Sequence, residues 1–409
     1  RYRMVGWCMP ALLLNSYDSQ PFPLNNYKKT ERRSLHTNKF STFVNTKKNK
    51  HMLTELEVFA KRLRQARIKE KLSMDALCEK VEGVVSKQAI SKYEAAKMMP
   101  SSPVLIALSE ALKVNLDYFF QPFKFDVEEM QISFRKKSSV RSKDIAALKI
   151  RIQEETEHYL EIEEILGKEA SIYNKVESGM VLSLPKDMLK CAQQVRDQWQ
   201  LGLDPIANVQ DILEANGIKV IPISGLEGFD GLSGMVNGMP IVVLNKDMKM
   251  AERLRFTALH EVGHLLFNQN IFTSLSEHDK EKMCHAFASE MLLPSDVITN
   301  TLAGKAKLSL NELIFLQEMY GISIDAIMYK LFQMGIVTEK RYKNFQIRKR
   351  MSKSFCATVE KSRYREELKD TRYTAMVYSA LAQQLITTSK AASMLGCSVA
   401  SVRNNVNVI

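Results

Sequence analysis

The sequence predicts a multidomain fold in which an all-α domain precedes an α+β domain, with a helical region at the C-terminal end. The first observation is length, because 409 residues (46.7 kDa) exceed the size of one ordinary domain. The second is that residues 54–121 show apolar residues at helical spacing only. The third is a change to strand-like runs between Leu201 and Asn245, after which helical spacing returns at Ala251.

The composition is that of an ordinary soluble protein. Hydrophobic residues make up 45% and charged residues 25% of the chain, which excludes a largely disordered protein. No run approaches the roughly 18 uninterrupted apolar residues of a transmembrane helix, so we expect no membrane partner. The cysteines stand far apart without a CxxC pair, which favours a reduced, cytoplasmic location. They are Cys8, Cys78, Cys191, Cys284, Cys356 and Cys397.

Residues 1–51 form a basic leader that shows neither helical nor strand periodicity. They contain ten Lys and Arg residues against Asp18 and Glu31, which accounts for +8 of the net charge of +12. We expect this leader to be disordered. A basic tail attracts any polyanion, so the pI of about 9.2 says little about a specific nucleic-acid site.

Residues 54–122 are predicted to form a compact all-α domain of five short helices. Ser73 and Ser86 are expected N-caps, because a serine hydroxyl can accept a hydrogen bond from the first turn of a helix. Gly83 is expected to end the second helix, and Pro100 precedes the last two helices.

The predicted helix after Ser86 has the character of a DNA-reading helix. Ile90 and Tyr93 would be hidden, while the other face is polar. Glutamine can read adenine through two hydrogen bonds, and lysine can contact guanine or phosphate in the major groove. The candidate DNA contacts are Lys87, Gln88, Ser91 and Lys92. The arginines of the first helix either hold phosphates or form its solvated face; they are Arg62, Arg64 and Arg67.

Residues 56–120 resemble the Cro/cI-type helix-turn-helix family, also called XRE. The matching stretches are Lys61–Arg64, Leu77–Val81, Ser86–Glu94 and Pro100–Tyr118. The resemblance implies double-stranded DNA as a partner. Two features depart from the family: the link Glu82–Val85 is longer than in the simplest repressors, and Ala96 stands where many relatives have glycine.

Residues 123–195 are predicted to be a helical connector. An alternating stretch opens it, with Met130, Ile132 and Phe134 on one side. A charged helix follows, from Ser142 to about Leu166, and we expect it to pack on one side only.

Residues 196–340 are predicted to be the α+β domain. Strands are expected at Ile218–Ile221 and at Ile241–Leu244. Asn237 and Gly238 precede the second run, and both tolerate the positive φ of a type I′ hairpin turn. The run Ile241–Leu244 is either an edge on which an extended peptide adds as a further strand, or a buried strand paired on both sides.

His260, Glu261 and His264 form an HExxH motif inside a segment with helical spacing. Residues four apart lie on one helix face, so both imidazoles can share one metal ion, and Glu261 projects beside them within reach of a bound water. This is the layout of a zinc hydrolase. A catalytic zinc usually has three protein ligands, and the best third candidate is Glu281 on the next predicted helix. The rival candidates are His278, Cys284, His285 and Glu290.

The segments Arg255–Leu266 and Phe287–Pro294, together with Glu281, resemble the ImmA/IrrE family of zinc metallopeptidases. The resemblance implies metal-assisted peptide hydrolysis with Zn²⁺ as cofactor. The implied metal ligands are His260, His264 and Glu281, and the implied catalytic residue, which takes the proton from water, is Glu261. His285 stands where the family commonly has asparagine, and Cys284 replaces the usual alanine.

Residues 341–409 are predicted to be a helical extension. Within it, the spacing of apolar residues in Ser389–Arg403 is typical of a small helix-turn-helix hairpin. We expect this hairpin to pack against the peptidase domain, with a second DNA reader as the alternative.

The expected fold class is therefore an all-α helix-turn-helix domain followed by an α+β zincin-like metallopeptidase domain with a helical C-terminal region. The predicted function is that of a cytoplasmic, DNA-binding transcriptional regulator whose zinc-dependent endopeptidase domain cleaves a repressor or antitoxin partner. The alternative is a DNA-binding regulator or antitoxin in which the zinc site is structural or sensory. A third hypothesis is a free-standing peptidase that docks on repressor-like proteins. A homodimer is a further expected assembly.

Overall fold

The structure is a computed structural model of the 409-residue chain. It describes residues 53–123, 130–132, 141–168, 185–225, 228–236, 238–267, 276–302, 308–364 and 372–406. The predicted basic leader, Phe134 and Asn237 lie outside the described residues. In these ranges, no helix combines the length and the hydropathy that a bilayer crossing requires.

The N-terminal helices form the predicted all-α domain. Within residues 53–123 the five predicted helices are present, and the last of them is a 3₁₀ helix. They are α1 (Glu55–Lys69), α2 (Met74–Lys80), α3 (Lys87–Glu94), α4 (Ser102–Leu112) and η1 (Leu116–Phe120). The predicted N-caps are confirmed, because Ser73 Oγ accepts from the Ala76 amide at 3.0 Å and Ser86 Oγ accepts from the Ala89 amide at 3.2 Å. One core buries Phe59, Leu63, Leu77, Ile90 and Phe119.

Ala96 follows the C-cap residue of α3, Ala95, and adopts a left-handed backbone conformation with φ +55°. Its amide donates to the Tyr93 carbonyl oxygen at 3.1 Å and so closes the helix end. The position where many relatives have glycine therefore carries a Cβ in a sterically unfavourable conformation, at a cost of roughly 1–2 kcal/mol.

Helix α5 (Ser142–Ile165) packs against α1 through charged and polar side chains. Arg62 Nη2 lies 2.9 Å from Glu157 Oε2, and both side chains are buried. Lys69 Nζ lies 2.6 Å from Glu154 Oε2. Arg62 is therefore neither a phosphate contact nor part of a solvated face, so both sequence-based interpretations of it were wrong.

A sheet lies next to α5. Its described strands are β1 (Met130–Ile132), β2 (Lys219–Ile223), β3 (Gly231–Val236) and β4 (Met239–Asn245), in the order β1-β3-β4-β2. The predicted hairpin is confirmed, since β3 and β4 pair antiparallel with Val236 opposite Met239, and Gly238 has φ +77°. β2 runs parallel to β4.

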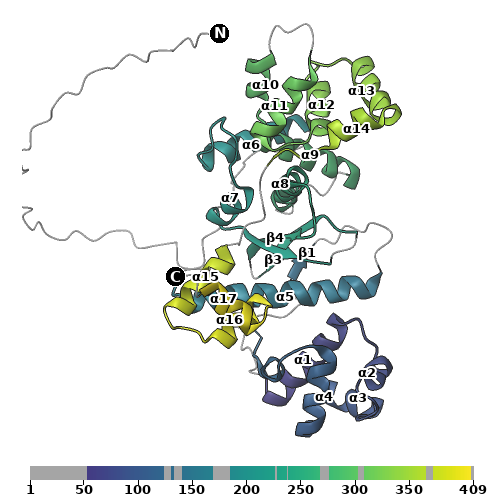
Figure 1. Ribbon diagram of the computed structural model, residues 1–409, viewed down its shortest axis with the longest axis vertical. Coiled ribbons are helices and arrows are strands. Elements are labelled where there is room, and N and C mark those ends of the chain that lie inside the picture. The colour runs from purple at the N-terminus through teal and green to yellow at the C-terminus, as the bar shows by residue number, and fades with distance from the viewer. Residues whose placement is uncertain are drawn as a thin grey trace, which may run out of the picture. The chain divides into compact units, whose positions relative to one another are not determined.

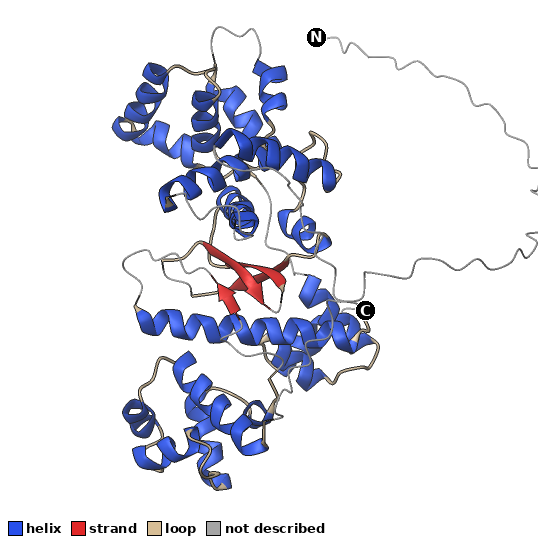
Figure 2. Ribbon diagram, turned by 180° about the vertical axis from the view of Figure 1, so that it is seen from behind, coloured by secondary structure: helices blue, strands red, loops and turns tan. Residues whose placement is uncertain are grey.

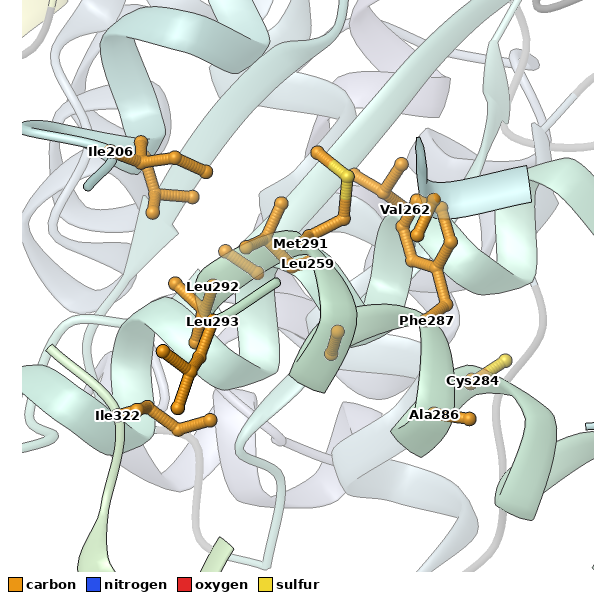
Figure 3. Packing of buried hydrophobic residues seen from close by; sticks show 14 of the residues in the cluster. Ile206, Leu259, Val262, Cys284, Ala286, Phe287, Met291, Leu292, Leu293 and Ile322 are labelled. Carbon is orange, nitrogen blue, oxygen red and sulfur yellow. The ribbon is translucent and has the colours of Figure 1, made fainter. Parts of the chain in front are cut away.

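The helices of the α+β domain follow and interleave with this sheet. They are α6 (Pro185–Gln198), α7 (Val209–Ala215), α8 (Ala251–Phe267), α9 (Glu277–Leu292), α10 (Ser295–Leu302), α11 (Leu310–Tyr320) and α12 (Ile324–Gln333). Leu259 and Val262 of α8 share one buried core with Phe287 and Met291 of α9 (Figure 3). At Gly263 the two helices come so close that a Cβ would lie 3.2 Å from the Cα of Cys284. The absence of a side chain at this position therefore permits the close packing.

β4 is a central strand, paired with β3 on one side and with β2 on the other. The edge-strand hypothesis for this run was therefore wrong, and the buried alternative is confirmed. Val242 and Leu244 pack toward α8, whereas Ile241 and Val243 pack toward α5. Figures 1 and 2 show these two helices on opposite faces of the sheet. Burial on both faces explains why the strand is a continuous apolar run.

Glu290 and Lys330 form a buried ion pair between α9 and α12. Glu290 Oε2 lies 2.5 Å from Lys330 Nζ, and the side chains are 0% and 4% exposed. Glu290 also accepts from the amide and the hydroxyl of Ser295, while Lys330 donates to the carbonyl oxygens of Ser289 and Leu293. The pair therefore fixes the turn between α9 and α10. Because the Glu290 carboxylate binds Lys330 and Ser295, this rival candidate is not at the metal centre.

The C-terminal region is helical, as predicted. Its described helices are α13 (Glu339–Met351), α14 (Lys353–Glu360), α15 (Arg372–Ala382), α16 (Thr388–Leu395) and α17 (Val399–Val406). The predicted terminal hairpin is present as α16 and α17. With α15 it forms a core that includes Tyr159 and Ile162 of α5.

Several elements cross the predicted domain limits. The limit between residues 195 and 196 falls inside α6, and the limit between residues 340 and 341 falls inside α13. β1 and α5 belong to the predicted connector. β1 pairs with β3 in the sheet, and α5 packs on one face of that sheet. β1, α5 and α6 of the predicted connector therefore supply structural parts of the α+β domain.

We expect Ala96→Gly to stabilise the helix-turn-helix domain by about 1 kcal/mol, because glycine adopts the left-handed conformation without the steric cost. Slower amide hydrogen exchange in α3 would measure the gain. Ala95→Gly is the matched control, since Ala95 has φ −89° and glycine relieves nothing there. Unchanged or faster exchange in Ala96→Gly would contradict the expectation.

We expect Lys330→Met to destabilise the α+β domain by about 3–5 kcal/mol, because it leaves the Glu290 carboxylate buried without its cation. Urea unfolding followed through Trp199, which lies in the same core, measures the change. The double variant Glu290→Gln, Lys330→Met removes both charges and should recover part of the loss. Equal instability of the single and double variants would show that the unpaired charge is not the cause.

Candidate metal centre

His260 and His264 lie one turn apart on α8 and point toward the same place. Their Nε2 atoms are 2.9 Å apart, and their ring centroids are 4.5 Å apart at nearly a right angle. The His264 side chain is 2% exposed and that of His260 is 12% exposed. The i, i+4 spacing of the motif therefore places both imidazoles together, as the sequence predicted.

Glu281, from the first half of α9, lies opposite this imidazole pair. Its Oε2 is 3.2 Å from His260 Nε2, and its Oε1 is 3.8 Å from His264 Nε2. Zinc–nitrogen distances of about 2.0–2.1 Å put the ligand atoms of a tetrahedral site roughly 3.3 Å apart. Two imidazoles and one carboxylate at this spacing fit a zinc ion, and they leave one position open.

Glu261 lies beside the imidazoles and is buried. One carboxylate oxygen, Oε2, accepts a hydrogen bond from the hydroxyl of Ser233 on β3 at 2.9 Å. Ligand-type atoms of Glu261, His260 and His264 all lie within 4.8 Å of one another. Ser233 was not among the predicted site residues; its one signal in the sequence is a hydroxyl between the apolar Leu232 and Gly234.

Cys284 contacts His264, but on the ring nitrogen that faces away from the candidate metal position. Its Sγ lies 2.6 Å from His264 Nδ1, whereas the Nε2 atom of His264 faces His260 and Glu281. Metal-binding histidines commonly hold their second nitrogen in such a contact, which fixes the tautomer and the ring orientation. The position of Cys284 thus fits a residue that orients a ligand.

His285 lies close enough to offer an alternative ligand set. Ligand-type atoms of His260, Glu281 and His285 lie within 4.8 Å of one another, as do those of the HExxH group. The His285 ring stacks on Phe256 at 5.6 Å between centroids. The His285 residue is exposed, but partial desolvation lowers the pKa of its imidazole and favours the neutral form that binds metal ions. The last rival, His278, lies exposed near the start of α9.

A cavity of 620 Å³ adjoins Phe256 of α8 and His285 of α9, and most of its surface is apolar. Of the residues in the two ligand sets, only His285 lines this cavity. Its ring-bearing lining residues are Phe256, His285 and Tyr329, and its charged lining residues include Arg253, Lys282 and Asp325. The space can hold a side chain of a bound peptide.

The predicted DNA-reading face of α3 is exposed. Lys87, Gln88, Ser91 and Lys92 are all exposed, whereas Ile90 and Tyr93 are buried in the domain core. Lys87 Nζ forms an exposed ion pair with Asp75 at 2.8 Å.

Of the predicted phosphate contacts on α1, only Arg64 is exposed. Arg67 instead binds Glu94 through two nitrogen–oxygen contacts of 2.6 and 2.7 Å. Arg67 therefore joins α1 to the end of α3.

Similarity to solved structures is weak. The apo form of ComR from S. thermophilus has 11% sequence identity to this chain, and the apo form of the competence regulator ComR from Streptococcus vestibularis has 9%. Each comparison covers 80% of this chain and 99% of the other chain, with a TM-score of 0.16. A score this low supports no conclusion about fold. No curated protein matches the chain.

Both candidate sites fall within segments that match known families. Residues 63–119, which contain α3, match the helix-turn-helix family model. Residues 213–332, which contain α8 and α9, match the family model of the IrrE N-terminal-like domain. The chain therefore joins a helix-turn-helix domain of the XRE type to a metallopeptidase-like domain of the ImmA/IrrE type, as the two sequence resemblances predicted.

Proposed function

We propose that this protein is a cytoplasmic, DNA-binding transcriptional regulator that uses Zn²⁺ to cleave a repressor or antitoxin partner. The observation that carries the proposal is the convergence of His260, His264 and Glu281 beside the buried carboxylate of Glu261. The exposed polar face of α3 in the same chain supports the DNA-binding part.

The proposed chemistry is hydrolysis of a peptide bond. When bound, zinc lowers the pKa of a water molecule toward about 7 and polarises the carbonyl that is attacked. His260, His264 and Glu281 would hold the ion. Glu261 would accept the proton of the attacking water and return it to the leaving amine. Ser233 would hold the Glu261 carboxylate in position through its hydroxyl hydrogen bond.

We place the peptide along β3, because β4 is paired on both sides. Among the described strands, β1 covers β3 only from Gly234 to Val236. The preceding part, Gly231–Ser233, contains the residue that contacts Glu261 and offers backbone groups for an added strand.

The second candidate function is that of a regulator whose zinc site is structural or sensory. The nearness of His285 to His260 and Glu281 favours it, because a further imidazole could fill the position that a catalytic site keeps open. A closed site would hold metal tightly without hydrolysing peptides.

We expect Glu261→Gln to retain one zinc per chain and to lose peptide cleavage by roughly 10²- to 10⁴-fold, the usual contribution of a general base. Metal analysis and mass spectrometry of a peptide library measure the two properties. His260→Ala is the matched control and should lose both zinc and cleavage. Zinc-bound wild-type protein that cleaves no peptide would favour the sensory function, and equal cleavage by Glu261→Gln would remove Glu261 from the mechanism.

We expect Ser233→Ala to lower kcat by about 10-fold or more, because a hydrogen bond to a charged group contributes roughly 1.5–3 kcal/mol. Zinc content should not change, since Ser233 contacts Glu261 rather than a proposed ligand. Ser309→Ala is a suitable control, because its hydroxyl caps α11 far along the chain from the centre. Loss of zinc in Ser233→Ala would argue against a positioning role.

A further inference from the structure

We propose that α16 and α17 form a second helix-turn-helix that binds double-stranded DNA through α17. The proposal does not depend on the metal centre. It rests on the geometry of the turn, on the way the helices pack, and on the character of the surface that α17 leaves exposed.

The turn between α16 and α17 has the form that a helix-turn-helix requires. α16 ends at Leu395, and Gly396 follows in the left-handed conformation with φ +61°. After Cys397, the Ser398 hydroxyl accepts a hydrogen bond from the Ser401 amide at 3.1 Å and caps α17. Two helices joined by a three-residue turn that contains glycine are the arrangement of this motif.

The packing leaves most of α17 free of the core. Ala391 and Ala392 of α16 are buried, and such small side chains let helices approach closely. Val402 is the one residue of α17 among those buried in the described part of this core. α15 supplies the third side of the core with Met376 and Val377. The three helices therefore form a small unit that holds α17 by one face.

The opposite face of α17 suits the major groove. Ser401, Arg403 and Asn404 are exposed. Arginine can donate two hydrogen bonds to guanine, asparagine can pair with adenine, and serine can contact bases or phosphates. Residues 372–406 contain three basic residues and no acidic residue, so no carboxylate on this unit repels phosphate.

The second unit repeats the plan of the first within one chain. α2 and α3 are also joined through a glycine with positive φ, Gly83, and α3 also hides apolar residues while it exposes polar ones. Both units pack on the same helix: α1 contacts Gln153, Glu154 and Glu157, whereas the C-terminal unit packs on Tyr159 and Ile162. Two DNA-binding units held by the same helix, α5, predict a DNA site with two separated half-sites.

The test is the selection of binding sites from a random pool of duplexes about 40 base pairs long, which accommodates two half-sites at least one helical turn apart. The full chain should select two conserved blocks. Arg403→Ala, Asn404→Ala together should lose one block and weaken binding to the selected site by about 10- to 100-fold. Gln88→Ala should relax the other block. Lys353→Ala removes an exposed positive charge on α14 and should preserve both blocks.

Charge reversal provides a second, independent measurement. Arg403→Glu should weaken binding more than Arg403→Ala and change its salt dependence, because it replaces a positive charge in the groove with a negative charge that the phosphates repel. Circular dichroism confirms that each variant is folded. The proposal is overturned if the Arg403 and Asn404 variants select the same two blocks with the affinity and salt slope of Lys353→Ala. It is also overturned if the intact chain selects only the block that Gln88→Ala relaxes.

Discussion

The close packing of α8 against α9 is the constraint on which the candidate metal centre depends. Gly263 lies between the two histidines of the motif, and its missing side chain lets the backbone of Cys284 approach. Glu281 precedes Cys284 by three residues, about one helical turn, so this approach places its carboxylate opposite the imidazole pair. The same contact brings the Cys284 thiol to His264 Nδ1. Gly263 thus allows both the position of Glu281 and the contact that orients His264.

The sheet completes the centre from the other side of α8. Gly231 of β3 lies so close to α8 that a Cβ there would meet the Thr257 side chain at 2.7 Å. This approach brings Ser233 within hydrogen-bond distance of Glu261. α5 covers the far face of the sheet and also carries the helix-turn-helix domain. The residues of the predicted connector therefore link the support of the metal centre to that of the DNA-binding domain.

Sequence patterns predicted the parts of the site that depend on one element. The i, i+4 spacing of His260 and His264 needs only a helix, and the family resemblance supplied Glu281. The continuous apolar run of β4 was compatible with an edge or a central strand, because pairing partners far along the chain decide between them. Arg62 looked like a surface residue since its partner, Glu157, is 95 residues away. Ser233 is a polar residue in an apolar strand, but its partner, Glu261, is 28 residues away, so the sequence did not predict their contact.

The interface between α1 and α5 has a physical consequence for how the molecule can rearrange. In the described residues, its side-chain contacts include charged pairs and a pair of amides. Water can hydrate these groups if the helices move apart, whereas an exposed apolar interface would promote association with other molecules. Separation at this interface would therefore expose charged and amide groups that water can hydrate.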